Sequence, residues 1–70
     1  MKTDEKQEII KALDEAAKEN KNKMFLVLGR CRINVDGSPI CQDNVTPNQC
    51  SEIAGYYNKI GHFDAGQSCP

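Results

Sequence analysis

Four cysteines, Cys31, Cys41, Cys50 and Cys69, place the strongest constraint on how this chain of 70 residues can fold. A core built from so few residues supplies only ~3–5 kcal/mol, so small natural domains usually add disulfides or a metal. Structural zinc and iron–sulfur sites usually contain a pair of cysteines about two to four residues apart, and this chain has no such pair. The even number and wide spacing favour two disulfides.

Three disulfide pairings are possible, and the spacing does not select one. We favour Cys31–Cys50 with Cys41–Cys69, because two cysteines on one buried strand face would bond outward to a helix and to the tail. Two alternatives remain open. The four cysteines could bind zinc or an iron–sulfur cluster in an accessory subunit, or they could be the thiols of a redox protein.

The cellular location is ambiguous. Disulfides indicate an extracellular or periplasmic protein. The first residues, Met1 to Glu5, lead directly into a charged segment and lack the apolar stretch of a signal peptide. This conflict keeps the metal alternative open.

Charge and hydropathy exclude two classes of partner. The formal net charge is −1, with 9 basic and 10 acidic residues, which does not fit nucleic-acid binding. The longest apolar run, from Met24 to Leu28, is far shorter than the ~20 residues of a membrane-spanning helix.

Residues 1–23 are predicted to form one charged amphipathic helix that begins at the N-cap Asp4 and ends in the left-handed conformation at Asn20 or Asn22. Residues 24–70 form a cysteine-bearing α/β unit, and the helix packs with it as a single domain. We expect the helix to fold back over the strand at Met24, Leu26 and Leu28, which favours a monomer; a homodimer is the alternative. Its apolar stripe consists of Ile9, Ile10, Leu13, Ala16 and Ala17.

Residues 25–35 alternate like a strand with one buried face, which includes Cys31. Arg30 and Arg32 fall on the opposite, solvated face. Asp36-Gly37 predicts a hairpin. A two-residue turn would place Cys41 on the face opposite Cys31. We prefer a three-residue turn, residues 36–38, because it keeps both cysteines inside.

Thr46-Pro47-Asn48-Gln49 predicts the start of a short helix, with Thr46 as the cap and Gln49 as its reciprocal partner. We expect Gly55 to end this helix, residues 56–60 to form a last strand, and residues 61–69 to form a loop. His62, the only histidine, could pair with a thiol as a nucleophile, but its position beside a glycine favours a plain loop residue.

The predicted fold class is α+β. It is a small disulfide-stapled domain with a long N-terminal helix, a β-hairpin or three-stranded antiparallel sheet, and a short second helix. No residue pattern indicates catalysis, so we expect a non-enzymatic binding or interaction module with a protein partner and no cofactor. The candidate interaction residues are the late aromatics, because aromatic side chains are enriched at interfaces; these are Tyr56, Tyr57 and Phe63.

Overall fold

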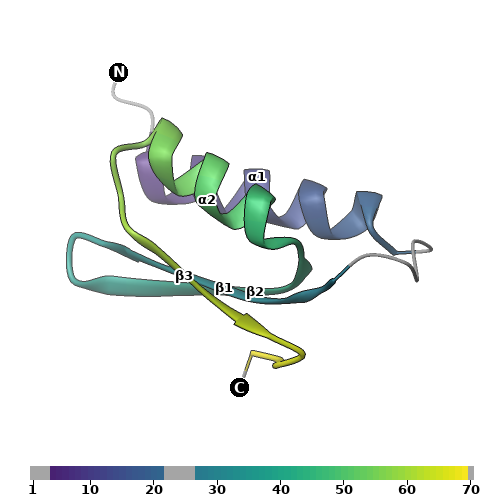
Figure 1. Cartoon of the computed structure of the whole chain (residues 1–70). Coiled ribbons are helices and arrows are strands. Elements are labelled where there is room, and N and C mark those ends of the chain that lie inside the picture. Colours follow the sequence, from purple (N-terminus) through teal and green to yellow (C-terminus); the bar gives the residue numbers. More distant parts are fainter. Residues whose placement is uncertain (1–3, 22–26, 70) are drawn as a thin grey trace.

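The computed structural model describes residues 4–21 and 27–69. In these residues two helices lie on one face of a three-stranded antiparallel sheet (Figure 1), which confirms the predicted α+β class. Within the part of the chain that the structure describes, no helix covers the other face of the sheet. The elements, in chain order, are α1 (Glu5–Glu19), β1 (Gly29–Val35), β2 (Ser38–Val45), α2 (Pro47–Tyr56) and β3 (Gly61–Ala65).

The strand β1 lies in the middle of the sheet, between β2 and β3. Cys31 and Ile33 are buried, whereas Arg32 and Asn34 are exposed, so the predicted alternation is confirmed. The strand begins at Gly29, later than the predicted residue 25. Gly29 is required there, because a Cβ would collide with the backbone of Asp64 in β3.

The turn of the β1–β2 hairpin has two residues, so the predicted three-residue turn is wrong. Val35 pairs with Ser38, and Arg32 pairs with Cys41. Asp36 and Gly37 both have positive φ, 52° and 80°, as in the two-residue turns whose twist matches that of the strands. Cys41 therefore lies on the outer face of the sheet, opposite to Cys31.

A bulge near the end of β2 changes the face of the sheet to which its last residue points. The register shifts between Gly29 and Cys31, and Asn44 takes a φ of 65°. The extra residue turns Val45 into the core, where its side chain is fully buried. Without the bulge, strict alternation would direct Val45 outward.

Asn20 joins α1 to the bulge and to α2. It was expected to end α1 in the left-handed conformation, but its φ is −88° and its side chain is 2 % exposed. Its Nδ2 donates to the Asn44 carbonyl at 3.2 Å and to Gln49 Oε1 at 2.6 Å. Asn44 Nδ2 in turn donates to the Ala17 carbonyl at 2.9 Å.

The helix α2 begins as the sequence predicts but ends later. Thr46 Oγ1 accepts from Gln49 N at 3.1 Å, and Gln49 Oε1 accepts from Thr46 N at 3.0 Å, which completes the capping box. Gly55 lies inside the helix. The left-handed residue after it is Asn58, with a φ of 58°.

The predicted strand and loop after α2 are both wrong. The last strand is β3 and not residues 56–60, and it contains His62, which was expected in a loop. β3 pairs with β1, with His62 opposite Arg32 and Phe63 opposite Cys31.

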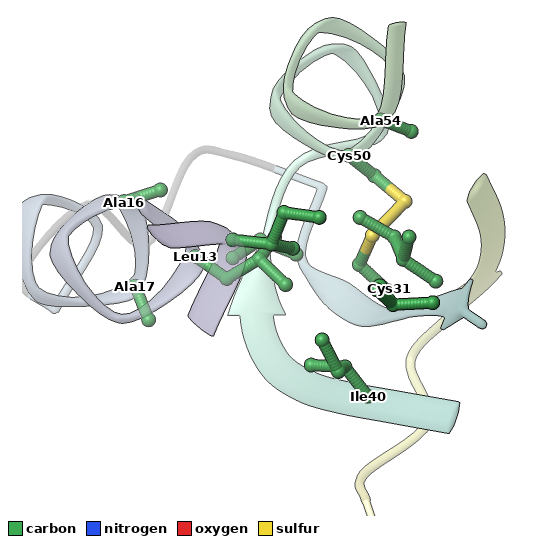
Figure 2. Packing of buried hydrophobic residues seen from close by; sticks show 11 residues of the cluster. Leu13, Ala16, Ala17, Cys31, Ile40, Cys50 and Ala54 are labelled. Atoms are coloured by element: carbon green, nitrogen blue, oxygen red, sulfur yellow. A yellow bond between two sulfur atoms is a disulfide. The ribbon is translucent and has the colours of Figure 1, made fainter. Parts of the chain in front are cut away.

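The core lies between the sheet and both helices (Figure 2). The helix α1 packs mainly against β2 and α2, and not over β1 as predicted. Met24 and Leu26, which α1 was expected to cover, lie outside the described residues, and Leu28 is half-buried. All the predicted stripe residues contribute to the core, with Ile10 at its margin. The fully buried side chains are Ile9, Leu13, Asn20, Cys31, Ile33, Val45 and Cys50.

Candidate functional site

All four cysteines form disulfides, in the two pairs that the sequence analysis favours. Cys31 is bonded to Cys50 inside the core, and Cys41 is bonded to Cys69 on the outer face. The reason given for this pairing was partly wrong, because Cys41 does not share a face with Cys31. Since the two pairs lie on opposite faces of the sheet, their sulfur atoms do not form a single four-cysteine metal site.

The outer face of the sheet carries a small charged cluster. Asp64 Oδ2 accepts a hydrogen bond from Arg30 Nε at 2.9 Å and forms an ion pair with Arg32, whose Nε lies 3.1 Å away. The hydrogen bond from Arg30 is the main cause that holds the pKa of Asp64 below its ordinary value, with Arg32 assisting. The pair of arginines thus keeps Asp64 ionised between β1 and β3.

The C-terminal segment, residues 66–69, lies across this outer face. Figure 1 shows the chain turning back beneath the sheet after β3, on the side away from the helices. Gly66 N donates to the Leu28 carbonyl at 3.0 Å, and Arg30 Nη1 donates to the Ser68 carbonyl at 3.4 Å. Cys69 then reaches Cys41 on β2, so the disulfide connects the two edges of the sheet across β1.

The three candidate aromatics occupy different environments. Tyr56 is 81 % exposed at the last residue of α2. Tyr57 packs against the core, and its ring meets that of Tyr56 edge-to-face, with 4.9 Å between the centroids. Phe63 is half-buried on the inner face of β3, opposite Cys31. The structure therefore brings Tyr56 and Tyr57 together and assigns Phe63 to the sheet.

The end of α2 is firmly held. Lys59 N donates to the Ala54 carbonyl at 2.8 Å and Asn58 N to the Gly55 carbonyl at 3.1 Å, which is the Schellman pattern around a left-handed residue. Lys59 Nζ lies 3.0 Å from the Glu5 carboxylate of α1. This hydrogen bond is the main cause that raises the pKa of Lys59.

Tyr57 also faces α1. Burial, followed by the nearby carboxylate of Glu8, raises the pKa of Tyr57 above its ordinary value. Ile60, which no sequence motif singled out, follows this end of α2 and is 74 % exposed. Its signal was an apolar residue between Lys59 and Gly61, which was wrongly assigned to a strand.

Among residues 4–21 and 27–69, no three side chains of His, Cys, Asp or Glu come together as a metal site would require. Within the same residues, no helix combines the length and the apolar character needed to cross a membrane. No protein-family model matches the chain, and neither a curated protein nor a solved structure matches it.

Proposed function

We propose that this chain is a disulfide-stabilised binding module that contacts a protein partner in an oxidising compartment and does not catalyse a reaction. The observation that carries the proposal is the exposure of Tyr56 at 81 %, on a helix end that is otherwise tightly fixed. Ile60, at 74 %, adds a second apolar side chain from the following segment.

A fixed aromatic side chain is suited to recognition. Tyrosine provides a large contact area and a polar tip, and it loses little conformational freedom on binding when it is already held. The ring of Tyr56 rests against Tyr57, which is anchored in the core. The Schellman bonds and the Lys59–Glu5 ion pair hold the backbone beneath it.

The two disulfides support the proposed compartment. Both would be reduced in the cytosol of most organisms, and a core of this size depends on such links for its stability. The Cys31–Cys50 bond also ties α2, and therefore the residue Tyr56, to the central strand β1.

Site-specific photo-crosslinking tests this proposal. A benzoylphenylalanine replaces Tyr56 and, in a matched control, the exposed Lys18 at the far end of α1. In periplasmic extract or culture fluid of the producing organism, we expect one discrete product from position 56, absent from position 18 and weakened by Ile60→Ser. No product, or the same product from both positions, contradicts the proposal. A product of twice the chain's own mass would show self-association instead of a partner.

A further inference from the structure

The two edges of the sheet differ in their ability to accept another strand. The outer edge of β2 contains Pro39, which has no N–H, and it is bent by the bulge at Asn44. Both features block strand addition. The strand β3 has neither a proline nor a bulge, and among the described residues its only strand neighbour is β1. An unpaired edge of this kind is a template for another strand.

Two observations show which residues of β3 form backbone hydrogen bonds to β1 and which ones face the free edge. Val35 and Ser38 flank the two-residue turn and so form a hydrogen-bonded pair. Because such pairs alternate along a ladder, the odd-numbered residues of β1 bond to β2 and its even-numbered residues bond to β3. The bond from Gly66 N to the Leu28 carbonyl fits the same phase.

It follows that His62 and Asp64, which lie opposite even-numbered residues of β1, direct their backbone N–H and C=O groups toward β1. Gly61, Phe63 and Ala65 direct their N–H and C=O groups to the free edge.

We propose that β3 pairs antiparallel with β3 of a second copy of this chain, around a two-fold axis at Phe63. In this register Phe63 lies opposite its own counterpart, and Gly61 lies opposite Ala65 of the copy. These are the residues with free backbone groups, so every one of them finds a partner. His62 then lies opposite Asp64 of the copy at a non-hydrogen-bonded position, where facing side chains are closest.

Hydrogen-bond complementarity on the outer face supports this register. His62 and Asp64 lie on the outer face, with their neighbours Arg32 and Arg30. Arg30 donates a hydrogen bond to Oδ2 of Asp64 and Arg32 forms an ion pair with the same oxygen, whereas no hydrogen bond to Oδ1 is formed by the described residues. Oδ1 is thus available to accept from the imidazole N–H of the second copy. The two-fold axis makes this contact twice.

The inner face leaves room for the second copy. The helix α1 packs on β2 and α2 packs on β3, so the flank of α2 away from α1 lies toward the free edge. Tyr57 lies on the flank near Glu8 of α1, and helical spacing places Ser51 and Gly55 on the opposite flank. Both residues are exposed, and a Cβ added at Gly55 would meet nothing within 4 Å. Two α2 helices can therefore approach closely across the axis, while the rings of Phe63 become covered.

A charge-reversal pair at position 62 tests the dimer, measured on the oxidised full chain by sedimentation equilibrium up to millimolar concentration. His62→Glu places a carboxylate beside Arg32 in the same chain but opposite Asp64 of the copy. His62→Lys keeps the attraction to Asp64. We expect the dissociation constant of the Glu variant to exceed that of the Lys variant by about tenfold. A chain that stays monomeric throughout, or variants with equal constants, would overturn the proposal.

Amide hydrogen exchange tests the register. Raising the protein concentration should protect the N–H groups of Gly61, Phe63 and Ala65, and leave those of His62 and Asp64 unchanged. A concentration-dependent dimer without this alternation uses another surface, and that result would also overturn the proposal.

Discussion

The two disulfides lie on opposite faces of one sheet and differ chiefly in what surrounds them. Cys31 and Cys50 are 0 % and 1 % exposed, whereas Cys41 and Cys69 are half-buried. The sequence separations are 19 and 28 residues, so loop-closure entropy assigns roughly 3 kcal/mol to each bond, with slightly more for the outer one. Any larger contribution from the inner bond must therefore come from packing.

The two sulfur atoms of the inner bond fill part of the core between α2 and β1. Figure 2 shows the Cys31–Cys50 bridge between α2 and β1, with Ala54 beside it. The α-carbon of Gly61 approaches so closely that an added Cβ would lie 3.2 Å from Cys50 Sγ. The outer bond instead ties the C-terminal segment to β2, and residues 66–68 of that segment are exposed. A cross-link in the core thus fills space as well as restricting the unfolded chain.

The largest expected effect is that of Cys31→Ala combined with Cys50→Ala. Loss of the cross-link and of the packed sulfur atoms should lower the free energy of unfolding by about 4 kcal/mol, close to the whole stability of such a domain. Urea denaturation followed by circular dichroism measures the change. A loss no greater than that of the outer pair would show that packing adds nothing.

Removing the outer disulfide by Cys41→Ala with Cys69→Ala should cost less, about 3 kcal/mol, because the loop-closure entropy is lost but little packing is lost with it. The domain should stay folded. Amide exchange should rise mainly in residues 66–69, including Gly66, whose N–H donates to the Leu28 carbonyl. If exchange rises equally in α2, the outer bond supports the core and the contrast between the two faces fails.

A smaller loss of stability is expected from Thr46→Ala, which changes the N-cap of α2 on the inner face of the sheet. It removes the acceptor of Gln49 N at the start of α2 and should cost about 1 kcal/mol. The denaturation midpoint measures this change. Asn48→Ala, at an exposed position of the same turn, is the matched control and should change stability little. Equal effects of both substitutions would contradict the role of the cap.

The smallest effect concerns Asp64 on the outer face. Its pKa is lower in the folded chain than in the unfolded one, so its ion pairs stabilise the fold above the unfolded value of ~3.9. This contribution is lost as the pH falls through the lowered folded pKa. The stability difference between the parent and Asp64→Asn should therefore be present at neutral pH and vanish in acid. Denaturation midpoints of both proteins, measured across this pH range, test the prediction. A stability difference that grows in acid would contradict it.

Much of the local structure could be predicted from sequence, because the groups concerned are close along the chain. The capping box from Thr46 to Gln49 needs only neighbouring residues, and the alternation around Cys31 follows from the pleat of a strand. The disulfide pairing was also favoured from this alternation, but the reason held only for Cys31, because Cys41 lies on the outer face. Of the interaction candidates, sequence could name Tyr56 but not its exposure, because its exposure depends on where α2 ends.

Tertiary contacts decided the rest. Gly55 and Asn58 could each have ended α2. The helix continues past Gly55 because Tyr57 packs against the core and because the chain that follows pairs with β1 as the strand β3. The bulge at Asn44 exists where Val45 must point inward and where Asn20 and Ala17 offer hydrogen bonds from a distant helix. The sequence by itself determined the two helices, the central strand and the need for disulfides. Only the tertiary structure set the turn length, the bulge and the last strand, because their energies depend on partners far away along the chain.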